Sequence, residues 1–209
     1  KIGNEKFREK DYKGAIEEYS KAIMLDPKFK EAYRNRGMAK HELQDYQGAI
    51  ADYSKAIEID TEFKEAYSNR GKAKYKLQDV QGTIEDFSKL IELDPHDKGA
   101  YFNRGYAKEL LEDFKSAIDD YSKAIEIDTE FKEAYSNRGK AKYKLQDYQG
   151  TIEDFSKLIE IDPHNKVAYF IRGYAKSKLE DYQGAIEDYH YSKAIQLSTH
   201  IERGISKME

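Results

Sequence analysis

The chain has 209 residues, of which 36% are charged and 39% hydrophobic, and its formal net charge is −4. It is too rich in apolar and aromatic residues for a disordered chain, and no apolar run approaches the ~20 residues that span a bilayer. Without cysteine there are no disulfides and no thiolate chemistry, and the charge gives no bulk attraction to nucleic acid. We expect a folded chain with no membrane span and no nucleic-acid partner. Because it lacks an initiating methionine and a signal-like segment, we also expect it to be an excised or processed piece.

A 34-residue repeat runs through the sequence. A tyrosine stands four residues before the marker glycine of five units, and an alanine stands two residues after it. A second period of 68 residues lies on top, since Asp52 to Asp79 is identical to Asp120 to Asp147. The array therefore grew by copying a two-repeat block. The marker glycines are Gly3, Gly37, Gly71, Gly105, Gly139 and Gly173.

Each unit is predicted to form two helices. The first, such as Lys64 to Leu77, is rich in helix-forming residues. The second, such as Gln47 to Ile59, carries an apolar stripe at helical spacing. An Asp-Tyr pair between them, as at Asp45, places an acid to cap the second helix. The pairs Asp26–Pro27, Asp94–Pro95 and Asp162–Pro163 have the form of a helix start, with aspartate as cap and proline at the first helical position.

One array over residues 1–209 is expected, because a single helix pair cannot bury its own stripe. Its units are 1–29 (partial), 30–63, 64–97, 98–131, 132–165 and 166–201, with 202–209 as a remnant. In the sixth unit, His190 and Tyr191 are inserted after Tyr189. Two residues turn a helix by ~200°, so Ala194 and Ile195 leave the stripe. We expect a bulge, a break, or a terminal helix that packs differently.

The sequence resembles the tetratricopeptide repeat family in its 34-residue period, its Tyr-Gly-Ala first helix, its Ala-Tyr-Ala second helix and its Asp-Pro joins. The resemblance covers nearly the whole chain. It implies an all-α, right-handed superhelical solenoid of about six helix-turn-helix repeats. It also implies a groove, lined mainly by first helices, that holds an extended or helical peptide segment of a partner protein.

An asparagine two residues before the glycine is a candidate for peptide binding in four units. In members of the family that bind extended peptides, an asparagine at this place faces the groove and bonds the ligand's backbone. An amide both donates and accepts, which suits a peptide group of any sequence. The alternative is that these asparagines cap or brace neighbouring helices. They are Asn35, Asn69, Asn103 and Asn137.

Basic and aromatic steps alternate at the other groove positions. The segment Lys64 to Lys76 has five basic residues and one acid, whereas Asp79 to Asp94 has one lysine and five acids. If first helices line the groove, it attracts acidic segments with aromatic or apolar anchors. The alternative is that these are solvated helix surfaces. The candidate residues are Lys72, Tyr75, Lys76, Phe102, Tyr106, Lys140, Tyr143, Lys144, Phe170 and Tyr174.

An arginine precedes the glycine in five units, and an acid follows the glycine by fifteen residues. An arginine and an aspartate on adjoining helices indicate an internal, bidentate ion pair rather than a ligand site. The residues concerned are Arg36, Arg70, Arg104, Arg138 and Arg172, with Asp52, Asp86, Asp120, Asp154 and Asp188.

Two other functions remain open. The start, Gly3 to Phe7, resembles the first repeat of chaperone-binding tetratricopeptide domains, which clamp a terminal carboxylate; Asn4 and Asn35 match that clamp, but Glu65 does not. A self-assembling array that stacks through its ends is the third reading. We expect no enzyme, cofactor or metal, because the five histidines show no ligand spacing and no phosphate-binding loop occurs.

Overall fold

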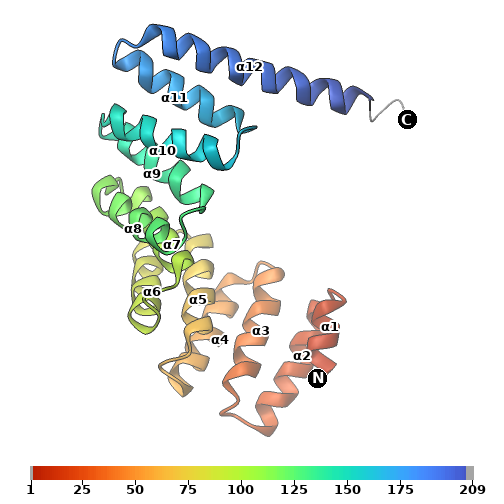
Figure 1. Ribbon diagram of the computed structural model, residues 1–209. Helices are drawn as coiled ribbons and strands as arrows, with labels where there is room; N and C mark the ends of the chain where they lie inside the picture. The colour runs from red at the N-terminus through yellow and green to blue at the C-terminus, as the bar shows by residue number, and fades with distance from the viewer. Residues whose placement is uncertain (1, 206–209) are drawn as a thin grey trace. The chain divides into compact units, whose positions relative to one another are not determined.

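The structure is a computed structural model that describes residues 2–205, with side chains described for residues 2–196. Helices joined by short turns make up the described chain, and that part contains no strand, so the predicted all-α class is confirmed (Figure 1). In chain order the helices are α1 (Ile2–Arg8), α2 (Tyr12–Leu25), α3 (Lys30–Glu42), α4 (Tyr46–Ile59), α5 (Lys64–Lys76), α6 (Val80–Leu93), α7 (Lys98–Leu110), α8 (Phe114–Ile127), α9 (Lys132–Lys144), α10 (Tyr148–Ile161), α11 (Lys166–Lys178) and α12 (Tyr182–Ile205).

The helices form two compact parts, each spanning several sequence repeats, which we call unit 1 and unit 2. Unit 1 covers Lys1–Leu111 and contains α1 to α7, and unit 2 covers Glu112–Glu209 and contains α8 to α12. Within each unit every helix packs against the next one in the chain, as the predicted stack of helix-turn-helix pairs requires. In unit 1 the first helices α3 and α5 also touch each other, so consecutive first helices form a shared face. No helix in the described part of the chain has the length and apolar character needed to cross a lipid bilayer.

The turn inside each pair is held by the predicted aspartate cap. Asp45 accepts a hydrogen bond from the backbone N–H of Gly48 at 2.9 Å, and Asp79 does the same with Gly82. The residue before each aspartate is in the left-handed region, as Gln78 is with φ 61°. A left-handed residue after a helix lets the chain reverse while the last carbonyls find partners. The turn is therefore determined locally.

The turn between pairs differs from the prediction. Asp26–Pro27, Asp94–Pro95 and Asp162–Pro163 do not start the next first helix, which begins three residues after the proline. Each aspartate instead follows the last residue of a second helix. Asp26 accepts the backbone N–H of Lys28 at 2.9 Å, and Asp94 accepts that of His96. An aspartate bonding the backbone two residues on, followed by proline, closes a turn as readily as it starts a helix. The sequence alone could not separate the two.

Small residues let the two helices of a pair approach closely. In the second pair Ala39, Ala49 and Tyr53 are buried. A methyl group added at Gly37 would lie 2.7 Å from the Tyr53 ring, closer than such atoms can approach. The glycine is therefore needed because an aromatic ring of the second helix lies against the backbone of the first.

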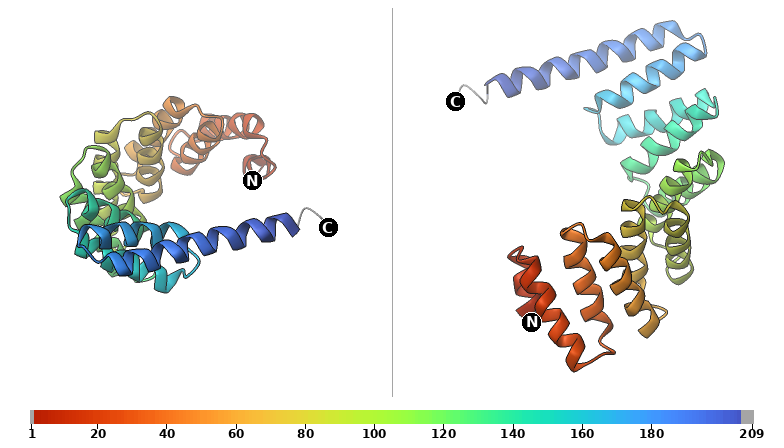
Figure 2. Two further views of the ribbon diagram at one scale, coloured as in Figure 1. Left: turned by 90° about the horizontal axis from the view of Figure 1, so that it is seen from above. Right: turned by 180° about the vertical axis from the view of Figure 1, so that it is seen from behind.

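The two-residue insertion does not interrupt α12, which runs unbroken from Tyr182 to Ile205 and extends past the end of α11 (Figure 2). Of the three expected outcomes, the different packing is found. Ala194 is exposed, Tyr191 stacks on Tyr169 at 5.5 Å, and Ser192 donates to the carbonyl of Lys166 at 2.9 Å. A helix gains less by bulging than by keeping its hydrogen bonds and presenting new side chains. Part of the expected remnant, 206–209, lies outside the described residues.

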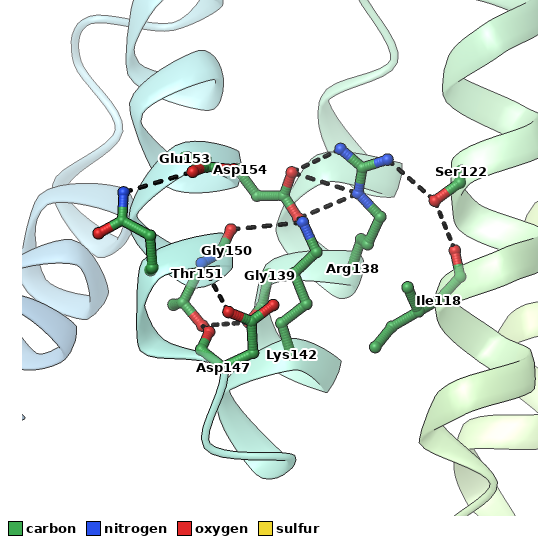
Figure 3. A network of polar contacts seen from close by, with 11 residues as sticks. Ile118, Ser122, Arg138, Gly139, Lys142, Asp147, Gly150, Thr151, Glu153 and Asp154 are labelled. Atoms are coloured by element: carbon green, nitrogen blue, oxygen red, sulfur yellow. Dashed lines mark hydrogen bonds and ion pairs between the residues drawn. The ribbon is translucent and has the colours of Figure 1, made fainter.

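A buried aspartate joins three successive helices in unit 2 (Figure 3). Asp154 on α10 pairs with Arg138 Nη2 at 2.5 Å and with Lys142 Nζ at 3.0 Å, both from α9. Arg138 Nη1 donates to Ser122 Oγ on α8 at 3.0 Å, and that hydroxyl lies in the helix preceding the pair. The arginine thus connects its own pair to the one before it.

The same network recurs in three other repeats. Asp52 forms ion pairs with Arg36 at 2.6 Å and with Lys40 at 2.8 Å, and Asp188 forms ion pairs with Arg172 and Lys176. The hydrogen bond to the aspartate is the main cause of a raised pKa in Arg36 and Arg172. Asp86 pairs with Arg70 and Lys74. Arg104 donates to Ser88 Oγ at 3.1 Å, and Asp120 is buried in unit 2.

The lysine of this network was missed in the sequence, although it stands one helical turn after every arginine. Its four-residue spacing from the arginine is the signal that both cations face one acid.

We predict that Asp86→Ala destabilises the chain by about 3–5 kcal/mol, because Arg70 and Lys74 are then left largely buried without an anion. Urea unfolding followed by circular dichroism measures the change. Glu92→Ala is the matched control, since it removes the exposed pair with Lys89 and should leave the midpoint near wild type. Equal effects of the two changes would contradict a special role for the buried aspartate.

Candidate functional site

Three adjoining hollows lie on helices α1, α2, α3 and α5 of unit 1, and together we call them the trough. The first, of about 300 Å³, is lined by residues that include Asn4, Arg8 and Asn35. It shares Arg34 and Met38 with the second, of about 390 Å³, which extends to Asn69. It shares Asn4 and Asn35 with the third, of about 490 Å³, whose lining is mostly apolar. Helices α1, α3 and α5 thus line the first two hollows, and the depression continues at the third onto α2, which contributes Leu25.

A chain of hydrogen bonds orders the middle of the trough. Tyr19 donates its hydroxyl to Asn4 Oδ1 at 2.8 Å, and Asn35 Nδ2 donates to the same oxygen at 3.3 Å. Arg34 donates to Asn35 Oδ1 at 2.8 Å through Nη2. Burial raises the pKa of Tyr19 while the charge of Arg34 opposes that rise, so the hydroxyl stays a donor. The amides are held in place by neighbours rather than left to rotate.

The wall of the first hollow is positively charged. Arg8 makes no ion pair with any described residue, and Arg34 bonds an amide instead of a carboxylate. Its guanidinium also lies 5.8 Å from the centre of the Phe63 ring, a cation–π contact that keeps it extended. Phe7 and Met38 supply apolar surface beside the two cations.

The four candidate asparagines differ in their surroundings. Asn35 and Asn69 line the trough, and Asn69 has no side-chain hydrogen bond within the described chain. Asn103 donates to the carbonyl of Gly99 in its own helix at 2.6 Å. Asn137 is the copy of Asn69 in unit 2, on α9. The geometry therefore brings Asn35 and Asn69 together and ties Asn103 to its own helix.

The remaining candidates form a pair of surfaces beyond the trough, one in each unit. In unit 1 the ring of Tyr75 lies 5.7 Å from that of Tyr106, and in unit 2 Tyr143 lies 5.6 Å from Tyr174. We call these the unit-1 platform (Lys72, Tyr75, Lys76, Tyr106) and the unit-2 platform (Lys140, Tyr143, Lys144, Tyr174). Phe102 is half-buried, and Phe170 is 55% exposed with its ring 5.6 Å from Tyr189.

Arg8, Arg34 and Met38 are trough residues that the sequence reasoning missed. Arg34 stands three residues before the marker glycine of its repeat, where the other complete repeats have serine or phenylalanine. Arg34 is identifiable in the sequence because it departs from the repeat. Comparison of the repeats selects only the residues that every repeat shares. No group of three histidine or acidic side chains suited to a metal occurs in the described part of the chain.

We predict that His41 reports the charge of the unit-1 platform. Burial lowers its pKa, and the charges of Lys76 and Lys72 lower it further. Lys72→Gln/Lys76→Gln should raise the His41 pKa in an NMR titration, whereas Lys55→Gln, which removes a lysine already paired with Glu58, should not. Because the pKa is depressed in the folded state, the contribution of His41 to stability is present above 6.5 and is lost as pH falls towards the folded pKa. A His41 pKa that ignores both lysines would contradict this.

The chain is similar to known repeat proteins in sequence and in fold. Models of the tetratricopeptide repeat match residues 3–44, 37–78, 99–131 and 132–165. A crystal structure of MamA is 25% identical, with 78% of this chain and 96% of that chain covered and a TM-score of 0.76. YrrB, described as a TPR protein with an unusual peptide-binding site, is 21% identical, with coverages of 90% and 97% and a TM-score of 0.76.

The C-terminal part of a TPR repeat-containing protein from Cytophaga hutchinsonii is 20% identical, with coverages of 95% and 79% and a TM-score of 0.84. No curated protein matches the chain significantly in sequence. The family models cover well over half of the residues, and the helix pairs have the expected length and packing. The chain belongs to the tetratricopeptide repeat family.

Proposed function

We propose that the trough of unit 1 holds an extended peptide segment of a partner protein. The fold and family are typical of protein-interaction scaffolds. The observation that carries the finer proposal is the pair Asn35 and Asn69, which line successive hollows of one depression. Two amides on neighbouring first helices can bond the backbone of a chain that crosses both helices. Backbone recognition of this kind fixes the path of the ligand and leaves its sequence to the other contacts.

The side chains around the amides favour an acidic segment with an apolar anchor. Arg8 has no carboxylate partner in the described chain, and Arg34 bonds only an amide, so an incoming carboxylate would find two cations. Phe7 and Met38 lie beside them, and methionine adapts its shape to different anchors. The mostly apolar third hollow offers room for a larger side chain.

A clamp for a terminal carboxylate is the narrower form of this proposal. Asn4 and Asn35 share a hydrogen bond next to Arg8, which is a suitable arrangement for a carboxylate. The adjoining hollow is lined by Glu65, and Asp94 in the same hollow is already paired with Lys64. That negative charge disfavours a terminal carboxylate in the second hollow, and it places the acidic side chains of a passing segment over the first hollow.

The test uses peptides selected from a random library on the whole chain. We expect Asn35→Ala/Asn69→Ala to weaken the selected peptides by about 30-fold, because two net hydrogen bonds are worth about 2 kcal/mol. Fluorescence anisotropy measures the affinity. Glu58→Ala/Glu92→Ala changes two exposed residues of second helices and should leave binding unaltered.

Each selected peptide is measured with a free C-terminal carboxylate and as the amide. Similar affinities support a segment that passes through the trough, and strong loss on amidation supports the clamp. Unaltered affinity of the doubly substituted chain would show that the peptide binds elsewhere, and the trough proposal would then fail.

Association through the array end is a second candidate, favoured by an exposed apolar cluster. Met24 and Leu25 are 82% and 88% exposed, and Ile2 is 58% exposed. Four other repeats have glutamate at the position of Met24, and each of these glutamates pairs with a lysine three residues earlier. In the first repeat, Lys21 pairs with Glu18 instead. The first repeat thus has an apolar side chain where those four repeats have a solvated acid.

We predict that self-association, measured by light scattering over a range of concentrations, is lost in Met24→Glu/Leu25→Glu. The Glu58→Ala/Glu92→Ala chain is again the control. A wild-type chain that stays monomeric at every concentration would exclude this candidate without affecting the trough.

A further inference from the structure

The two platforms are copies of one another in sequence and in geometry. The lysines and the first tyrosine of each platform lie in the segment that is repeated without change, from Asp52 to Asp79 and from Asp120 to Asp147. Their second tyrosines, Tyr106 and Tyr174, both follow a marker glycine directly. The ring separations of 5.7 and 5.6 Å show that each unit reproduces the arrangement by itself.

The tyrosine rings of the platforms are not core side chains. Tyr106 and Tyr174 are 37% and 41% exposed, although each rests against a partner ring. The neighbouring hydroxyl of Tyr106 is the main cause of the raised pKa of Tyr75. Burial, followed by the bond to Tyr174, raises the pKa of Tyr143 to about 12. The hydroxyls of Tyr75 and Tyr143 therefore stay protonated and uncharged at neutral pH.

The platform lysines have no ion-pair partner among the described side chains, unlike one lysine in each of four second helices. Lys55, Lys89, Lys123 and Lys157 each pair with a glutamate three residues later, at 2.6 to 2.8 Å. Lys72, Lys76, Lys140 and Lys144 are exposed and make no ion pair with any residue whose side chain is described. On the same helix, Lys74 is committed to the buried Asp86. In each platform, exposed lysines without an ion pair to any described side chain therefore lie on the same first helix as one tyrosine of a partly exposed pair.

We propose that the chain carries two binding sites of the same chemistry, the unit-1 platform and the unit-2 platform, each for an acidic peptide segment that bears one aromatic side chain. The inference rests on the proposed function only in treating the first-helix face as the ligand-binding surface. It adds that the partner presents this acidic, aromatic motif more than once, or that two partner chains bind together.

The chemistry of the occupant follows from the two features of each platform. Unpaired ammonium groups on the helix that carries Tyr75 or Tyr143 favour carboxylates over any other common side chain. Two tilted rings with exposed edges and faces offer an aromatic side chain the offset or edge-to-face contact that aromatic pairs prefer. A purely apolar occupant would leave the lysines without a role, and a purely acidic one would leave the rings exposed.

The two sites should differ in strength. In unit 2, Tyr148 adds a third ring at 5.5 Å from Tyr143, where unit 1 has Val80. Lys178 Nζ lies 5.3 Å from the centre of the Tyr174 ring, where unit 1 has Leu110. The additional ring and cation should make the unit-2 platform the tighter site.

The experiment follows tyrosine ring signals by NMR in the whole chain while the probe peptide acetyl-Glu-Asp-Phe-Glu-Asp-amide is added. We expect the signals of Tyr75 and Tyr106 to follow one binding curve and those of Tyr143 and Tyr174 a second, tighter one. Tyr75→Ala should abolish the first curve and leave the second unchanged, and Tyr143→Ala should do the reverse. Raising the salt concentration should weaken both, because exposed charges are screened.

Lysine variants test the same sites without touching the rings, in case a tyrosine change disturbs folding. Lys72→Gln/Lys76→Gln should weaken the unit-1 curve about fivefold and spare the unit-2 curve. Lys55→Gln/Lys89→Gln removes two paired lysines and should change neither curve. A probe with alanine in place of phenylalanine should bind more weakly at both platforms.

A single binding curve for all four tyrosines, loss of both curves on Tyr75→Ala, or no movement of the ring signals would overturn the inference. Its failure can be told apart from failure of the trough. If library peptides respond to Asn35→Ala/Asn69→Ala while the probe leaves the platforms unmoved, the trough stands and the two-site inference falls. If the probe binds both platforms and the asparagine change has no effect, the reverse holds.

Discussion

A buried carboxylate held between an arginine and a lysine joins the helix pairs of this chain. Asp154 is 2% exposed and accepts both Arg138 and Lys142, while the same arginine reaches back to Ser122 in the preceding pair. A charge removed from water is tolerated only when its partners are well placed, so the three helices have little freedom to slide. Apolar stripes supply most of the stability, and the network supplies the register.

That register determines which residues remain for binding. In α5, Arg70 and Lys74 turn towards Asp86 between the helices and Ala73 is buried, while other positions of the same helix face outwards. Lys72, Tyr75 and Lys76 occupy those outward positions. The structural ion pairs and the candidate ligand contacts therefore share one helix without competing, because helical geometry separates them by about 100° per residue.

Departures from the repeat are more informative about binding than the repeated positions are. Arg34 replaces the serine or phenylalanine of other units and lines two hollows of the trough. Met24 replaces a glutamate and leaves an apolar end. The inserted Tyr191 moves to the side of α12 and stacks on Tyr169. A repeated residue is explained by stacking, whereas a residue that breaks the pattern needs a local reason.

The sequence by itself determined the helix pairs, the aspartate caps and the pairing of arginine with aspartate, because all of these depend on spacing within about one repeat. Only the tertiary structure decided that Asp26 closes a turn, that Lys142 joins the buried network, and that Asn35 lines the trough while Asn103 bonds its own helix. Those outcomes depend on which neighbouring helix a side chain meets and on what already occupies its hydrogen-bonding groups. Periodicity places a residue on a face of a helix, but the partner on that face is supplied by packing.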